Sequence, residues 1–163
     1  MAVIPHPPVR RAAVAVAALA AAAPLLALGT ERFMGLVPCA LCLWQRWPYW
    51  VAAALALLAA GLRSRGLLAA SGVLVLASVA LAGVHVGVEQ GWWPSPLPAC
   101  GAPVATGAAT AEELMRSLAP APAKPCDAPT FLVPGVPVSM AAMNGFYALS
   151  LAALALTWAR RRS

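Results

Sequence analysis

Long apolar runs alternate with short polar segments along this chain. The runs cover about residues 12–29, 47–62, 67–88 and 138–159. Each is near the length that a helix needs to cross roughly 30 Å of hydrocarbon, and their alanine- and leucine-rich composition favours helices over the alternation of a barrel strand. We therefore predict an all-α membrane protein with one domain, a bundle of four transmembrane helices joined by loops at about 30–46 and 89–137.

The composition supports the membrane class. Of the 163 residues, 62% are hydrophobic and 10% are charged, which is more apolar surface than a soluble core of ordinary composition hides. A cleavable signal peptide is the alternative for the first run, because Arg10 and Arg11 precede it and small residues fill it. A retained span is favoured, since the later spans need an even partner.

Charge is divided between the two ends of the predicted spans. Basic residues gather before the first run, between the second and third, and after the fourth, at Arg10, Arg11, Arg63, Arg65, Arg160, Arg161 and Arg162. All five acidic residues fall in or beside the other two loops, at Glu31, Glu89, Glu112, Glu113 and Asp127. The positive-inside rule then places both termini in the cytoplasm and the two loops in the bacterial periplasm. This placement accounts for the pI of about 9.9, so we predict no nucleic-acid partner.

All four cysteines lie in the two outer loops. Cys39 and Cys42 form a C-x-x-C pair in the first loop, and Cys100 and Cys126 lie in the second. Two dithiols on the oxidising side of one membrane predict electron transfer by thiol–disulfide exchange. Two alternatives remain, a scaffold of four spans held by two structural disulfides and a Cys₄ zinc site. The short, strained ring of a C-x-x-C disulfide argues against the scaffold. The wide separation of Cys100 and Cys126 argues against the zinc site, so we predict no metal.

The second outer loop is rich in proline and alanine, which favours extended chain without a core of its own. Within it, residues 110–113 read Thr-Ala-Glu-Glu, in the form of a capping box, and Leu114, Met115 and Leu118 follow on one helical side. We predict a short amphipathic helix there, lying on the membrane surface. A solvated loop helix with no role is the alternative.

The chain carries the string PCALCLWQR at residues 38–46, the outer pair Cys100 and Cys126, and a pattern of four spans. Together these motifs resemble the DsbB family, the quinone-linked disulfide oxidases of bacterial inner membranes. The segment HVGVEQGWWPSP at residues 85–96, and Ser139 with Asn144, resemble further family segments more weakly. The segment FLVPGVPV at residues 131–138 departs from the family pattern, so the path into the fourth span is not predicted.

The resemblance implies a membrane thiol:quinone oxidoreductase. It would reoxidise a periplasmic thioredoxin-fold dithiol oxidase of the DsbA type and pass the electrons to membrane quinone, most simply ubiquinone, with menaquinone as the alternative. By the same resemblance, Cys100 forms the mixed disulfide with the partner, Cys126 attacks Cys39, and Cys42 is left as the thiolate that faces the quinone. A related reductase that runs in the opposite direction would carry the same cysteines.

The residues near Cys42 support this chemistry independently. Cys42 is expected to begin a helix, where the helix dipole and free amide groups favour a thiolate. Arg46 follows one turn later on the same face, where it would stabilise negative charge on the Cys42 sulfur or on a bound quinone. Snorkelling of Arg46 to the headgroups is the alternative. The aromatic residues at this helix start suit a membrane-interface belt, and one or two of them could line a quinone groove: Trp44, Trp47, Tyr49 and Trp50.

His85 and Glu89 share one face of the third span near its outer end. We predict that His85 binds the quinone as a hydrogen-bond donor or proton source, because reduction of a quinone by two electrons also takes two protons. A mutually satisfied interfacial pair is the alternative for both residues. Glu31 and Arg32 are expected to form a solvated pair in the first loop.

Overall fold

The computed structural model describes residues 8–100, 124–132 and 135–160 of the chain. In these residues the regular structure is helical, apart from one isolated bridge between Phe131 and Ser139. The all-α prediction is therefore confirmed. The amphipathic helix predicted from residues 110–118 lies outside the described residues.

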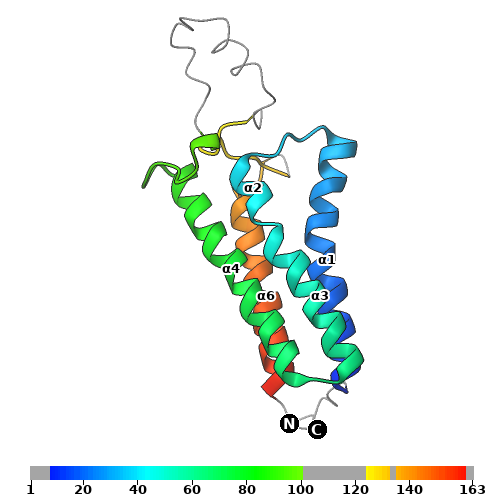
Figure 1. The fold of residues 1–163 in the computed structure, drawn as a ribbon. Helices are drawn as coiled ribbons and strands as arrows, with labels where there is room; N and C mark the ends of the chain where they lie inside the picture. The colour runs from blue at the N-terminus through cyan, green and yellow to red at the C-terminus, as the bar shows by residue number, and fades with distance from the viewer. Residues whose placement is uncertain (1–7, 101–123, 133–134, 161–163) are drawn as a thin grey trace, which may run out of the picture.

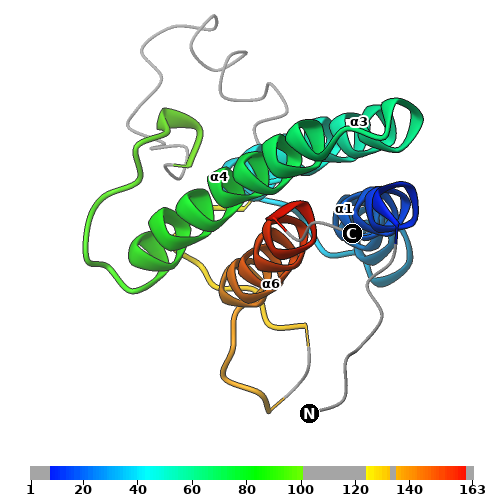
Figure 2. The same ribbon diagram turned by 90° about the horizontal axis from the view of Figure 1, so that it is seen from below.

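Four helices lie side by side and form the body of the molecule, as Figures 1 and 2 show. They are α1 (Val9–Met34), α3 (Trp47–Leu62), α4 (Arg65–Glu89) and α6 (Met140–Arg160). Helix α4 packs along α6 and α3, and α1 packs along α3 and α6. The helix bounds agree with the predicted apolar runs to within a few residues, except at the end of α1.

Three of the helices, α1, α4 and α6, are long and apolar enough to cross a membrane. Helix α3 coincides with the predicted run at 47–62 but has only 16 residues. A helix of that length rises about 24 Å, which is less than the roughly 30 Å of a hydrocarbon core. The fourth span therefore stays a prediction.

The interior of the bundle is built mainly from small side chains. Alanines of all four helices, such as Ala20, Ala56 and Ala152, are fully buried in one hydrophobic cluster. Gly72 of α4 faces α6 so closely that an added Cβ would lie 3.0 Å from the Ala155 side chain. Small residues let helix backbones approach each other closely. Such close packing holds membrane helices together, because in lipid the hydrophobic effect does not drive helices to associate.

The segment predicted as the first loop, at 30–46, is partly helical. Helix α1 continues to Met34 and stops at Gly35, whose φ of 66° is left-handed and suits a helix C-cap. A second short helix, α2 (Ala40–Trp44), then forms inside the predicted loop. Glu31 to Met34 extend α1 because all four are compatible with a helix, and only the glycine ends it.

The segment after α4 turns back onto the helix end. The Trp93 ring lies against Gly87, and its indole N–H donates to the Val84 carbonyl over 3.1 Å. A short 3₁₀ helix, η1 (Pro98–Cys100), then brings Cys100 beside α2. The route into α6, which the sequence left open, runs through the Phe131–Ser139 bridge and a 2.8 Å bond from the Met140 amide to the Thr130 carbonyl.

Charge separates along the bundle as predicted. The end where α1 begins, α6 ends and α3 turns into α4 carries basic residues, at Arg10, Arg11, Arg63, Arg65 and Arg160. The acidic residues of the described part, Glu31, Glu89 and Asp127, all belong to the other end, with α2 and the cysteines. Which end faces the periplasm stays a prediction.

Candidate redox site

All four cysteines meet at one end of the bundle. Cys100 and Cys126 form a disulfide, whereas Cys39 and Cys42 are free thiols. Cys39, Cys100 and Cys126 are buried in a single cluster with Leu41 and Val88, and Cys42 packs against it. The structure thus brings together two pairs separated by more than 50 residues, one oxidised and one reduced. A short path for disulfide exchange between them is available.

The reduced pair is bound by a compact set of hydrogen bonds. The two sulfurs lie 2.8 Å apart, and the Cys39 sulfur also accepts from the Cys42 amide at 3.3 Å and lies 3.5 Å from His85 Nε2. Cys39 is the N-cap of α2. Cys42 therefore lies in the first turn of α2, two residues after Ala40, close to the predicted helix start.

This geometry decides which sulfur of the reduced pair ionises first. Hydrogen bonding to Cys42, together with that to His85, lowers the pKa of the Cys39 thiol to about 4 even though burial opposes the charge. The pKa of Cys42 is raised, because its thiol is bonded to the Cys39 sulfur, is partly buried and lies beside a negative neighbour. In this redox state the thiolate is favoured at Cys39. The thiolate predicted at Cys42 belongs to the state in which Cys39 is bonded to Cys126, and it stays a prediction.

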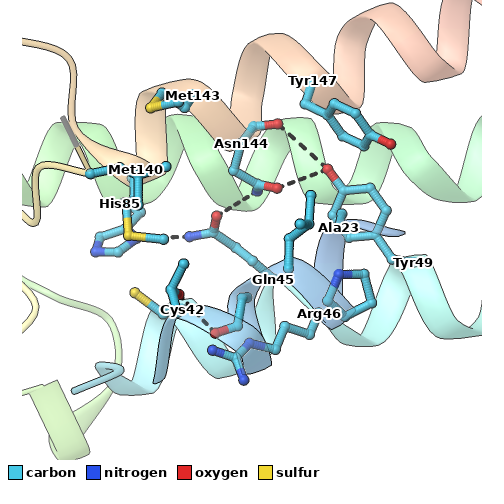
Figure 3. A pocket seen from close by; sticks show the side chains of 16 residues that line it. Ala23, Cys42, Gln45, Arg46, Tyr49, His85, Met140, Met143, Asn144 and Tyr147 are labelled. Carbon is cyan, nitrogen blue, oxygen red and sulfur yellow. Dashed lines mark hydrogen bonds between the residues drawn. The ribbon is translucent and has the colours of Figure 1, made fainter. Parts of the chain in front are cut away.

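A cavity of about 300 Å³ opens beside Cys42, between α1, α3, α4 and α6 (Figure 3). Most of its wall is apolar. Its polar side chains run along the wall from Cys42 to Tyr147, as Figure 3 shows, and they are Thr30, Cys42, Gln45, Arg46, Tyr49, His85, Asn144 and Tyr147. A largely apolar cavity of this size with a few convergent polar groups is the usual form of a small-molecule site. The three predicted ligand-binding residues, Cys42, Arg46 and His85, all line it.

Arg46 is paired across the cavity rim. Its guanidinium donates to the Glu31 carboxylate of α1, and the two side chains are 15% and 24% exposed. The expected solvated pair of Glu31 with Arg32 was wrong, because the extra turn of α1 carries Glu31 to Arg46. The pair supplies a partner for Arg46 inside the protein, and the positive charge lowers the pKa of Cys42, though less than the Cys39 bond raises it.

His85 is buried, with 2% of its surface exposed. Its Nε2 lies 3.5 Å from the Cys39 sulfur and 3.9 Å from Glu89 Oε1. The Ser139 hydroxyl in turn donates to the other Glu89 oxygen at 2.5 Å. His85 and Glu89 do form the mutual pair foreseen as an alternative, but His85 also touches a reactive sulfur and the cavity.

Gln45 and Asn144, to which the sequence analysis gave no role in the site, complete it together with Tyr49. Gln45 contacts His85 Nδ1 at 2.7 Å, Asn144 of α6 donates to Gln45 at 2.6 Å, and the Tyr49 hydroxyl donates to Asn144 at 2.8 Å. Figure 3 shows this chain along the cavity wall. A polar amide inside an apolar run, as at Asn144, was the available signal.

The aromatic residues of this region divide into two groups. Trp44, Trp47 and Trp50 are exposed, as expected of residues in an interface belt. Tyr49 is buried and lines the cavity. Of the four aromatic residues considered for a groove, Tyr49 is therefore the one that the structure brings to it.

The donor atoms of Cys39, Cys42 and His85 lie within 4.8 Å of one another, a grouping that soft metal ions also use. The Cys₄ zinc site considered from the sequence is not formed in this structure, because Cys100 and Cys126 are bonded to each other.

Comparison with known proteins agrees with this site. The family model described as "Disulfide bond formation protein DsbB" matches residues 9–158, nearly the whole chain. Neither the curated proteins nor the solved structures give a match. Members of this family are membrane oxidoreductases that act in disulfide bond formation and are in general quinone-linked. With its two cysteine pairs at one end of an apolar helical bundle, the chain belongs to the DsbB family.

Proposed function

We propose that this protein is a thiol:quinone oxidoreductase of the inner membrane that reoxidises a periplasmic thioredoxin-fold dithiol oxidase of the DsbA type. The observation that carries the proposal is the single cluster that holds both cysteine pairs, with Cys42 at the edge of an apolar cavity. In this proposal four helices span the membrane, with both termini cytoplasmic and the cysteines periplasmic. The arginines at the opposite end of the bundle support that orientation.

The cavity suits the head group of a quinone. Its wall is mostly apolar, its volume of about 300 Å³ is that of a small-ligand site, and Cys42, Arg46 and His85 are among its polar lining residues. Cys42, Arg46 and His85 would hold the head group there, with Tyr49 as an aromatic neighbour. A bound quinone supplies the acceptor for two electrons and two protons. Ubiquinone is the simplest candidate and menaquinone the alternative.

The proposed exchange begins at the outer disulfide. A thiolate of the reduced partner attacks Cys100, which forms a mixed disulfide and breaks the Cys100–Cys126 bond. The second partner thiol then displaces Cys100, so the partner leaves oxidised. Cys126, released as a thiolate, attacks Cys39 of the Cys39–Cys42 disulfide, breaks that bond and forms a Cys126–Cys39 disulfide. Cys100 then attacks Cys126, which re-forms the Cys100–Cys126 disulfide and releases Cys39, so the inner pair is left reduced. The balance is one disulfide formed in the partner, with its two electrons and two protons passed inward.

Reoxidation of the inner pair needs one of its sulfurs as a nucleophile. The hydrogen bonds that lower the pKa of Cys39 favour that sulfur as the thiolate in the reduced pair. The S–S bond forms between Cys39 and Cys42, and two electrons leave toward the cavity. Arg46 contributes a positive charge at the cavity wall, where negative charge develops.

The partner step is tested by trapping. A thioredoxin-fold oxidase that retains only its attacking cysteine is mixed with the oxidised protein in lipid nanodiscs, and the product is mapped by peptide mass spectrometry. The proposal predicts a mixed disulfide at Cys100 and none in the matched Cys100→Ser protein. A mixed disulfide at Cys39, or none in the wild type, would contradict it.

Two competing functions are separated by further measurements. A reductase that runs in the opposite direction would reduce an oxidised partner when supplied with quinol, and our proposal predicts that net flow runs from partner dithiol to quinone. A scaffold held by structural disulfides would show no turnover, and its cysteine variants would lose only stability.

A further inference from the structure

The polar chain that ends at His85 has a direction. The Tyr49 hydroxyl donates to Asn144 Oδ1, the Asn144 amide nitrogen donates to Gln45 Oε1, and Gln45 Nε2 faces His85 Nδ1, over 2.8, 2.6 and 2.7 Å. A side-chain amide accepts at its oxygen and donates at its nitrogen, so the orientation of one link fixes the next. With Tyr49 as the first donor, His85 Nδ1 is the final acceptor.

This direction decides where a neutral His85 carries its proton. An accepting Nδ1 has a lone pair, so the proton sits on Nε2. Nε2 lies 3.5 Å from the Cys39 sulfur and 3.9 Å from Glu89 Oε1. Both are acceptors when ionised, and a thiolate and a carboxylate favour an N–H over a lone pair. The hydrogen bond at Nδ1 and the two acceptors near Nε2 therefore favour the same tautomer of His85, with its proton on Nε2.

We propose that Tyr49, Asn144 and Gln45 are positioning residues that hold His85 as its Nε2–H tautomer, so that the imidazole donates a hydrogen bond to the Cys39 sulfur. The three residues come from α3, α6 and the turn between α2 and α3, whereas His85 belongs to α4. The chain thereby links the packing of α6 to the reactive sulfur. The catalytic use of this bond rests on the proposed function, but the tautomer does not.

The hydrogen-bonded side chains of Tyr49, Asn144 and Gln45 are held tightly enough to fix the tautomer of His85. Gln45, Tyr49 and His85 are buried, and no buried side-chain nitrogen or oxygen among the described residues lacks a partner. Turning over Asn144 alone would set its oxygen against Gln45 Oε1, and turning over Gln45 alone would set its nitrogen against the Asn144 nitrogen, so reversal requires both amides to turn together. Among the described residues, the charged and titratable groups that contact Cys39 or His85 are Cys42 and Glu89, and beyond Cys42 lies Arg46 paired with Glu31.

Nuclear magnetic resonance of the whole protein tests the proposal directly. The chain has two histidines, so a His6→Gln protein labelled with ¹⁵N-histidine reports His85 alone. In the reduced protein in nanodiscs, ¹⁵N shifts and N–H couplings identify which ring nitrogen carries the proton. We expect Nε2–H in the wild-type chain. A wild-type His85 protonated at Nδ1 would overturn the proposal without any other variant.

Two nearly isosteric variants test the chain itself. In Gln45→Glu the new carboxylate accepts a hydrogen bond from Asn144. It can only accept from His85 as well, so His85 Nδ1 has to carry the proton. In Asn144→Asp, which does not touch His85, the carboxylate accepts from Tyr49 and from Gln45, so the Gln45 amide turns and its oxygen faces His85. Both should move the proton signal to Nδ1.

The matched control is Gln90→Glu, which adds the same charge at the exposed end of α4, outside the chain. It should leave His85 in the Nε2–H form. If Asn144→Asp leaves the tautomer unchanged, or if Gln90→Glu changes it equally, the positioning role is refuted. These readouts need no partner or quinone, so they succeed or fail separately from the oxidase assay.

Discussion

Removing the Glu31 carboxylate should lower the free energy of unfolding, because the ion pair between Glu31 and Arg46 is lost. In Glu31→Gln the guanidinium at the cavity rim loses its charged partner but keeps its place beside Cys42. The expected loss follows from the environment of the pair. Two opposite charges about 4 Å apart attract by about 4 kcal/mol at an effective dielectric constant of ~20. Desolvation and the ordering of two long side chains offset much of that attraction.

The net coupling lies between two limits. Fully exposed pairs contribute about 0.2–1 kcal/mol, whereas breaking a buried pair costs about 3–5 kcal/mol. With side chains 15% and 24% exposed, we expect a coupling of about 1–2 kcal/mol for Glu31 and Arg46. Arg32, one residue along α1 and exposed, should show a coupling near zero.

A double-mutant cycle measures this coupling. The free energies of unfolding of Glu31→Gln, Arg46→Gln and the double variant are compared with the wild type, from denaturant titrations in mixed micelles. The same cycle with Arg32→Gln in place of Arg46→Gln is the control. Equal coupling of Glu31 to both arginines, or a coupling below about 0.3 kcal/mol to Arg46, would refute the pairing.

Two further predictions concern the thiols and the turn after α4. Because the folded pKa of Cys39 is depressed to about 4, its thiolate stabilises the reduced protein fully above the ordinary thiol pKa, and this contribution is lost as the pH falls toward 4. The stability difference between the reduced wild type and Cys39→Ser should therefore shrink between pH 8 and pH 5 in denaturant titrations, and a difference independent of pH would contradict it. Gly87→Val should expel the Trp93 ring, since an added Cβ would lie 2.0 Å from it, at a cost of about 1–3 kcal/mol. Gly83→Val, where nothing lies within 4 Å, should be nearly neutral. Denaturant titrations measure both variants, and equal losses of stability would refute the contact.

The helical class and the grouping of the cysteines could be predicted from the sequence, because lipid imposes long apolar helices and the arginines mark one end of them. The loop bounds could not. Residues 31–34 are polar enough to suggest a loop, yet helix α1 continues through them until Gly35. Because of that extra turn, Glu31 pairs with Arg46 and not with Arg32, its predicted partner.

The order of ionisation in the reduced pair also escaped prediction. It depends on which cysteine caps α2 and on the approach of His85 from a helix more than 40 residues away. The role of Asn144 was hidden for the same reason. A single amide in an apolar run signals a buried polar contact, but its partners, Gln45 and Tyr49, become known only when α6 is packed against α3 and α4.

The most direct test of the central claim is quinone reduction followed optically. Purified protein in nanodiscs is mixed with a reduced thioredoxin-fold dithiol protein and a soluble ubiquinone analogue, and the wild type is compared with Cys42→Ser. We predict rapid loss of the quinone absorbance with the wild type and loss of turnover by at least about 10³-fold with Cys42→Ser, as for removal of a reacting group, because the Cys39–Cys42 disulfide can no longer form. Normal turnover by Cys42→Ser, or no quinone loss by a folded wild-type protein with any dithiol donor, would contradict the account.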